Sequence, residues 1–392
     1  MALHLKRFWA GALTLLLSGV LGAAQANDLV HLMRTPDGGI QPQAVMDQHG
    51  TLHLVYLKGD PAGCDVFYVK RPKNQRVFSQ PIRVNSEPGS AIAIGTVRGA
   101  QLALGKNERV HVAWNGAQPA RDPGAKGAPM LYARLDDSGK SFEPQRNLMT
   151  STMNLDGGGS VAADGKGNVY VVWHAHPRTG IEDELHRVVY VARSRDEGRS
   201  FAPEHKVNDG ETGVCACCGL KAFADSKGRL FVLYRAVNEH SSRDSQLLVS
   251  TDHGATFHSR LLGAWQSSIC PMSTPALGKG PDKTIIAAWE TQGQVYRGFV
   301  VPERLDERLS AAAADGGTGG RKHPVFALSE GKASRLLMAW TEGTGWNKGG
   351  SLAWECIDLK DGQKASGELP GVPVWGMAAA APEADGTFTL IY

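Results

Sequence analysis

The sequence SVAADGKGNVYVVW, residues 160–173, contains the pattern that decides the fold. A run of small residues is followed by a turn of Asp, Gly and Lys, and a second run then alternates apolar residues up to Trp173. Alternation with a period of two is typical of a β-strand that buries one face. The stretch therefore predicts a β-hairpin with a small inner strand and an aromatic residue at the end of its second strand.

The same pattern occurs seven times along the chain, and each copy ends at an aromatic residue. These residues are Tyr56, Trp114, Trp173, Tyr234, Trp289, Trp340 and Tyr392, at intervals of 51 to 61 residues. Two further strand-like runs separate each hairpin from the next, such as RVVYVARS and EHKVN after the third. Four strands in a repeat of this length predict an all-β fold, a β-propeller of four-stranded blades.

Seven hairpins favour seven blades around a central channel. The seventh copy stops after its second strand, so we expect the N-terminal run Asp28–Arg34 to add an outer strand and close the ring. Closure of this kind removes exposed sheet edges. No stretch shows a sustained 3.6-residue period with caps, so we expect almost no helix.

The N-terminus has the pattern of a secretory signal peptide. The basic residues Lys6 and Arg7 precede an apolar run over residues 8–21, and an A-x-A pattern follows at 24–26. We therefore expect cleavage after Ala26, export to the periplasm or the medium, and a single propeller domain over residues 27–392. No second apolar run approaches the ~20 residues of a membrane span.

The charge of the chain argues against nucleic acid as a partner. The sequence has 42 Lys and Arg residues against 39 Asp and Glu residues, and two of the basic residues belong to the leader. A protein that binds phosphates along a nucleic acid needs a basic surplus or a basic stripe, and neither is visible. We expect a monomer that binds a small molecule, a glycan or a metal ion at the mouth of its channel.

Three turns carry a recognisable motif. Ser194–Phe201 (SRDEGRSF) and Ser250–Phe257 (STDHGATF) match the Asp-box pattern S-x-D-x-G-x-[ST]-[FW], and Asp136–Phe142 (DDSGKSF) matches from its Asp onward. Over essentially the whole mature chain, the sequence resembles the BNR/Asp-box superfamily of sialidase-like propellers. The resemblance implies that the boxes are folding devices opposite the active site, so Asp137, Asp196 and Asp252 are not expected to be catalytic. Because many sialidases have six blades, six is the alternative to seven.

The resemblance also implies a possible sialidase chemistry, in which three arginines hold a carboxylate and a Glu activates a Tyr nucleophile. Arg34-Thr35-Pro36 resembles the R-[IT]-P signature but lies five to seven residues too early, and the aligned position is Ile40-Gln41-Pro42. The other weak catalytic candidates, which lack a diagnostic context, are Arg98, Arg235, Arg297, Glu290 and Tyr296. A sialidase-type glycoside hydrolase is therefore an alternative function without its signature residues.

The cysteines are the most unusual residues of the chain. Cys215-Ala216-Cys217-Cys218 directly precedes the inner strand of the fourth repeat, and Cys270-Pro271-Met272 occupies the same place in the fifth. Such links should lie at the channel mouth, on the face opposite the Asp boxes. Cys64 is expected on the same face. His174 and His176 follow the second strand of the third repeat, where a period of two places both imidazoles on one side.

Thiolates, a thioether and imidazoles form a soft ligand set that suits Cu(I) best and Zn(II) next. Our leading hypothesis is an exported propeller with a metal or redox site, copper favoured over zinc. The predicted metal ligands are Cys215, Cys217, Cys218, Cys270, Met272, His174 and His176. The paired C-x-C-C and C-P-M motifs are similar to those of other exported sialidase-like propellers, which implies a shared site but not its chemistry.

Disulfide bonds are the competing interpretation of these cysteines. Exported proteins form them readily, and a non-catalytic propeller that binds a glycan or a protein could use the cysteines as structural crosslinks. Cys356 lies inside a predicted strand and is expected to be a buried hydrophobic residue. An odd number of cysteines would then remain at the mouth, which argues against a complete set of disulfides.

Overall fold

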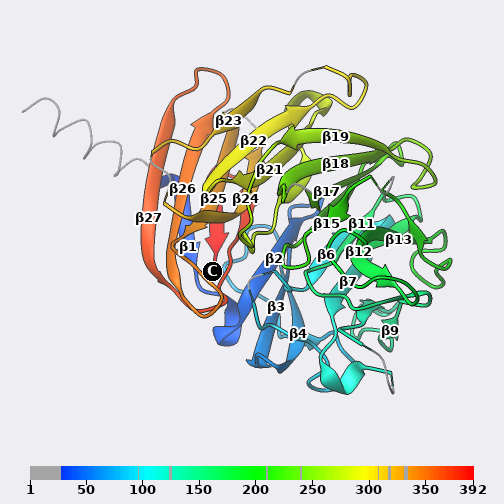
Figure 1. The fold of residues 1–392 in the computed structure, drawn as a ribbon. Coiled ribbons are helices and arrows are strands. Elements are labelled where there is room, and N and C mark those ends of the chain that lie inside the picture. Colours follow the sequence, from blue (N-terminus) through cyan, green and yellow to red (C-terminus); the bar gives the residue numbers. More distant parts are fainter. Residues whose placement is uncertain are drawn as a thin grey trace, which may run out of the picture.

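The computed structural model describes residues 28–95, 97–122, 126–208, 211–238, 241–307, 309–316, 319–330 and 334–392. Over these residues, seven β-sheets make up the seven blades of a β-propeller (Figure 1). The predicted signal peptide lies outside the described residues. Within the described part, no helix is both long and apolar enough to cross a membrane.

Blades 1 to 4 follow one another along the chain. Blade 1 consists of β2 (Ile40–Met46), β3 (Leu52–Asp60), β4 (Gly63–Arg71) and β5 (Ile82–Arg83), and blade 2 of β6 (Gln101–Leu104), β7 (Val110–Asn115), β8 (Met130–Arg134) and β9 (Arg146–Asn147). Blade 3 contains β10 (Thr152–Met153), β11 (Ser160–Ala163), β12 (Val169–Pro177), β13 (Val188–Ser194) and β14 (His205–Lys206). Blade 4 contains β15 (Gly213–Val214), β16 (Lys221–Ala224), β17 (Leu230–Val237), β18 (Asp244–Ser250) and β19 (His258–Gly263).

Blades 5 to 7 complete the ring. Blade 5 consists of β20 (Ala276–Lys279), β21 (Ile285–Thr291), β22 (Gln294–Val300) and β23 (Ala311–Ala313), and blade 6 of β24 (Arg321–Ser329), β25 (Arg335–Glu342), β26 (Gly350–Asp358) and β27 (Lys364–Val372). Blade 7 combines β28 (Ala379–Pro382) and β29 (Phe388–Ile391) with β1 (Val30–Met33). The 3₁₀ turns are η1 (Pro36–Gly38), η2 (Lys106–Glu108), η3 (Gln118–Ala120) and η4 (Pro281–Lys283).

The N-terminal strand closes the propeller as the sequence predicts. β1 runs parallel to β29, with Val30 opposite Phe388 and Met33 opposite Ile391. The inner strands contact one another around the ring in the order β2, β6, β11, β16, β20, β24 and β28, and β28 contacts β2 again. The seven-bladed prediction is therefore confirmed, and the six-bladed alternative is wrong.

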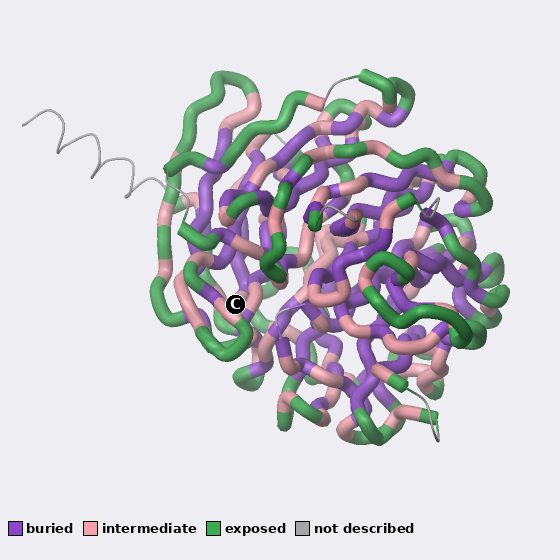
Figure 2. Tube along the Cα trace, in the orientation of Figure 1, coloured by how far each residue is buried: buried purple, intermediate pink, exposed green. Residues whose placement is uncertain are grey.

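The hydrophobic core lies between neighbouring blades, because each sheet buries both faces against the next. Leu57 of blade 1, for example, packs in one cluster with Val112 and Trp114 of blade 2. Buried residues fill the middle of the strands, and exposed residues gather at turns and outer strands (Figure 2). Small residues on the inner strands leave a central channel of about 700 Å³.

The Asp boxes stabilise turns between third and fourth strands. Asp196 accepts hydrogen bonds from the Ser194 hydroxyl at 2.7 Å and from the Ser200 backbone N–H at 2.9 Å. In the incomplete box the register differs from the predicted one, since Asp136 accepts the hydroxyl protons of Ser138 and Ser141. Leu135 stands there in place of the first serine and lacks its hydroxyl, and the aligned Asp137 pairs with arginines instead.

Candidate thiol centre at the channel mouth

The C-x-C-C segment interrupts the inner strand of blade 4. β15 and β16 both pair with β17, and residues 215–220 bulge out between them. The Cys215 N–H donates to the Arg235 carbonyl at 3.0 Å, which holds the start of the bulge against β17. The C-P-M segment precedes β20 of blade 5, as predicted.

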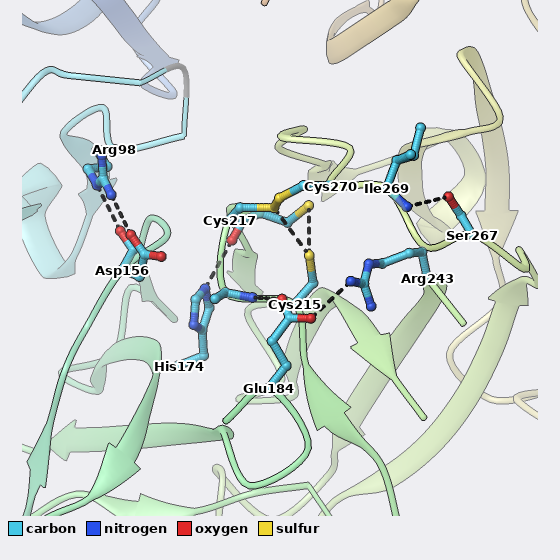
Figure 3. The surroundings of a disulfide bond; sticks show 12 residues. Arg98, Asp156, His174, Glu184, Cys215, Cys217, Arg243, Ser267, Ile269 and Cys270 are labelled. Atoms are coloured by element: carbon cyan, nitrogen blue, oxygen red, sulfur yellow. Dashed lines mark hydrogen bonds and ion pairs between the residues drawn. A yellow bond between two sulfur atoms is a disulfide. The ribbon is translucent and has the colours of Figure 1, made fainter. Parts of the chain in front are cut away.

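The two segments are joined covalently. Cys217 and Cys270 form a disulfide bond with their Cα atoms 6.6 Å apart, and Figure 3 shows it above the Cys215 thiol. Cys270 is exposed, whereas Cys215 and Cys218 are buried. The bond confirms the predicted juxtaposition of the two loops, and it also confirms that some of the cysteines are oxidised in this state.

The remaining thiols of the bulge lie directly beneath the disulfide. The sulfur of Cys215 lies 3.4 Å from that of Cys217 and 3.5 Å from that of Cys218, and all three lie within 4.8 Å of one another. Across the described ranges, these cysteines form the one group of Cys, His, Asp and Glu side chains close enough to hold a metal ion. The structure therefore brings together three of the seven predicted ligands as a compact sulfur cluster.

The two buried thiols are coupled by a hydrogen bond. Cys215 donates its S–H to Cys218, and this bond together with burial raises the pKa of Cys215. Burial also opposes ionisation of Cys218, but the bond from Cys215 and the nearby Arg235 guanidinium outweigh it and lower the pKa of Cys218. A thiolate at Cys218 is a nucleophile and a soft ligand.

Polar contacts fix the bulge in place. The Glu184 carboxylate accepts the Ala216 backbone N–H at 3.0 Å and a guanidinium N–H of Arg243 at 2.9 Å (Figure 3). Gly219 lies so close to the loop of blade 5 that an added Cβ would approach Thr274 Oγ1 to 2.5 Å. Glu184 and Arg243 belong to no recognisable sequence motif. They lie in separate segments of the mouth face and hold the bulge through contacts that the sequence does not reveal.

The predicted histidine ligands approach the bulge without joining the sulfur cluster. His174 and His176 lie within β12 rather than after it, and both are 1% exposed. Their Nε2 atoms donate to the carbonyl oxygens of Cys218, at 3.0 Å, and of Asp183, at 2.7 Å. Burial lowers the pKa of His174 to about 3, so its ring is neutral. Both Nδ1 atoms are buried without a hydrogen-bond partner among the described residues.

The other sulfur residues have separate positions. Met272 is half-buried, two residues after Cys270, with its backbone in the left-handed region. Cys64 lies in β4 and donates to the Ala91 carbonyl at 3.3 Å, and burial raises its pKa to about 12. It packs in the core between blades 1 and 2, so it is not a neighbour of the cluster. Cys356 is buried in β26, as expected.

Two of the candidate sialidase arginines form ion pairs that join neighbouring blades. Arg235 of blade 4 donates to Glu290 of blade 5 at 2.9 Å, and Arg297 of blade 5 donates to Glu355 of blade 6 at 2.7 Å. Burial raises the pKa of Glu290, although the Arg235 charge acts against that shift.

The Glu–Tyr pair does not form on one face of its sheet. Tyr296 lies opposite Trp289 and stacks on it, with ring centroids 6.1 Å apart, while Glu290 lies opposite Val295. Because successive residues of a strand point to opposite faces, Glu290 and Tyr296 face different neighbours.

The two remaining arginines are also apart from each other. Arg98 binds Asp156 and the Ile94 carbonyl at the mouth, and its guanidinium lies 5.6 Å from the Trp346 ring centre. Arg34 is exposed after β1 and lies 4.3 Å from the ring centre of Tyr392. Arg98, Arg235 and Arg297 each pair with a different carboxylate of the chain.

Comparison with known proteins extends the description of the fold. No protein-family model and no curated protein matches the chain. A solved protein of unknown function from Dyadobacter fermentans superposes with a TM-score of 0.52 at 15% identity, over 86% of this chain and 96% of that one. The fold is sialidase-like.

Two sialidase structures support this assignment. The Hadza microbial sialidase Hz136 superposes with a TM-score of 0.52 at 13% identity, over 82% of this chain and 69% of its own. The leech intramolecular trans-sialidase gives 0.51 at 8% identity, over 91% and 86%. Superpositions at such low identity establish the propeller architecture only. The chemistry of the channel mouth has to be argued from the residues of this chain.

Proposed function

We propose that this chain is an exported sialidase-like propeller whose mouth carries a thiol centre for a soft metal ion, Cu(I) in preference to Zn(II). The observation that carries the proposal is the cluster of Cys215, Cys217 and Cys218 sulfurs within 4.8 Å of one another. Metal–sulfur bonds of about 2.3 Å place the sulfurs of a shared ion roughly 4 Å apart. The cluster therefore needs only small side-chain adjustments to hold one ion.

Coordination number favours copper. Structural zinc sites almost always have four ligands, whereas soft thiolates select Cu(I). The cluster supplies three thiolates, and His174 next to it uses Nε2 to bind the Cys218 carbonyl rather than the sulfurs. The reduction that frees Cys217 also frees Cys270, but the exposed Cys270 thiol would have to turn inward to make a fourth ligand for zinc.

The disulfide controls how many ligands are free. While Cys217 is bonded to Cys270, only the Cys215 and Cys218 thiols remain. Reduction releases Cys217 and completes the set of three. We therefore expect the reduced protein to bind copper much more tightly than the oxidised protein.

The test is copper binding by reduced protein under anaerobic conditions. The protein is treated with a phosphine reductant, freed of it, and titrated with Cu(I) against a colorimetric chelator. We expect one tightly bound ion per chain, strong weakening in Cys215→Ala/Cys218→Ala, and no change in the matched control Cys64→Ala, whose thiol lies in another part of the core. Equal binding by all three proteins would refute a thiol centre, and a preference for Zn(II) would refute the choice of copper.

A non-catalytic binding propeller is the second candidate, and the Cys217–Cys270 bond favours it as a structural crosslink. The sialidase-type hydrolase has less support, because Arg235 and Arg297 already neutralise Glu290 and Glu355. Hydrolysis of a fluorogenic sialoside by the purified protein would support the hydrolase instead.

A further inference from the structure

The surface beside the disulfide is hollowed. A groove of about 760 Å³ lies at Cys270, and its lining includes Trp265, Ile269, Glu290 and Lys322. Ile269 is 65% exposed, which is high for a large apolar side chain. In Figure 3, Ile269 and Ser267 lie on the far side of Cys270 from Cys217. A molecule in the groove would therefore approach the disulfide from the Cys270 end.

The groove contains a lysine that makes no ion pair with the described residues. The Glu290 carboxylate is already bound by Arg235 and by the Gly293 N–H, at 2.9 Å each. The Lys322 ammonium has neither a hydrogen bond nor an ion pair to any part of the chain that the structure describes, and it is partly buried. The charges of Glu290 and Cys218 act on it only from beyond ion-pair distance. One cation is thus left for a ligand that carries a negative charge.

We propose that this groove binds a small thiol that carries a carboxylate, and that this thiol reduces the Cys217–Cys270 bond. The inference rests on the proposed thiol centre and adds the regulation of that centre: the anionic thiol releases Cys217 and so completes the metal site. Lys322 binds the carboxylate, and the exposed apolar side chain of Ile269 covers the body of the ligand.

The reaction is a thiol–disulfide exchange in two steps. The ligand thiolate attacks Cys270 Sγ, the bond between Cys217 and Cys270 breaks, and Cys217 leaves as a thiolate. Cys215 Sγ lies 3.4 Å from Cys217 Sγ, so its one S–H can turn from Cys218 to that leaving group. A second ligand thiolate then attacks the ligand sulfur of this mixed disulfide, Cys270 leaves as a thiolate, and the two ligands form a disulfide-linked dimer. Two ligand thiols are oxidised in total, and two protein thiols are formed.

The accessibility of the sulfurs determines which of them reacts. Cys270 is exposed and lines the groove, whereas Cys217 is only partly exposed and sits against the buried thiols. Attack in the opposite sense, on Cys217, would require the ligand to enter the sulfur cluster itself. The mixed disulfide should therefore form on Cys270 alone.

The experiment compares the rates at which mercaptoacetate and neutral 2-mercaptoethanol reduce the full-length oxidised protein. Each rate is divided by the rate of the same thiol with a small uncharged disulfide, which removes intrinsic differences between the two thiols. We expect about a fivefold preference for mercaptoacetate, the upper range measured for one solvent-exposed ion pair. Lys322→Gln should abolish the preference, and the matched control Lys227→Gln, which removes a lysine paired with Glu303 elsewhere, should keep it.

Acid quenching, alkylation and mass spectrometry of the intermediate identify the sulfur that is attacked. A ligand adduct on Cys270 with an alkylated Cys217 supports the proposal. An adduct on Cys217, no reduction, or a charge preference that survives Lys322→Gln would overturn it. Copper binding is measured separately, after phosphine reduction, and does not depend on the groove. If the groove proposal fails, the copper titration still tests the thiol centre. If the thiol centre fails, the copper titration alone shows it.

Discussion

Removal of the Cys217–Cys270 bond should lower the stability of the propeller by an amount that its position allows us to calculate. The two cysteines are 53 residues apart, and four of the five strands of blade 4, β16 to β19, lie between them. In the chain-entropy model, closing a loop of this length removes about 14 cal/mol/K from the unfolded state, which is about 4 kcal/mol at 25 °C. Cys270 is exposed, so Cys270→Ser should cost little through lost packing.

The assay is urea unfolding followed by tryptophan fluorescence, with and without reductant. We expect the free energy of unfolding of the wild-type protein to fall by 2–4 kcal/mol in reductant, the typical effect of a disulfide. The Cys270→Ser variant should start near the reduced value and should not respond to reductant. This variant is the internal control, because Cys64, Cys215, Cys218 and Cys356 are thiols in both proteins. A wild-type protein that is indifferent to reductant would refute the reasoning.

Two further predictions concern buried charges. Arg235→Met leaves the Glu290 carboxylate buried without its partner, so we expect the free energy of unfolding, measured in urea, to fall by about 3–5 kcal/mol. The double variant Arg235→Met/Glu290→Gln should recover much of this loss. Equal stability of the wild type and the single variant would contradict the prediction. The pKa of His174 is about 3 when folded and near 6.5 when unfolded, so its contribution to stability is complete above pH 6.5 and is lost as the pH falls towards 3. Between pH 7.5 and 5, the wild-type protein should lose about 2 kcal/mol more than His174→Gln, and parallel pH profiles would show that the imidazole is not the cause.

The sequence contains most of the information about the fold because each blade repeats the same local rules. Alternating apolar residues predict the seven hairpins, and the unpaired seventh hairpin predicts that β1 closes the ring. Predictions were less accurate where a local pattern was incomplete. Leu135 replaces the first serine of an Asp box, and the turn then uses Asp136 rather than Asp137.

The contacts of the thiol centre are harder to predict from the sequence, because they join residues of different blades. The placement of Cys217 beside Cys270 follows from the repeat, but the sequence alone leaves open whether they bind a metal or each other. Arg235 and Glu290 are 55 residues apart, and the pattern of neither residue indicates that they form a pair. His174 and His176 were expected after a strand, yet β12 continues through them and buries both rings.

The geometry of a propeller explains why one sulfur can serve two purposes. Residues that occupy equivalent positions in successive blades face each other across the blade interface, and the spacing of 53 residues between Cys217 and Cys270 is one repeat. The C-x-C-C bulge places two buried thiols behind Cys217, and the C-P-M loop places one exposed sulfur in front of it. Cys217 can bond to Cys270 or supply a thiolate beside Cys215 and Cys218, but not both at once. If the cluster holds a metal ion as we propose, metal binding by three thiolates and formation of the disulfide are mutually exclusive, and an oxidant or thiol that acts on Cys270 should change the affinity of the site.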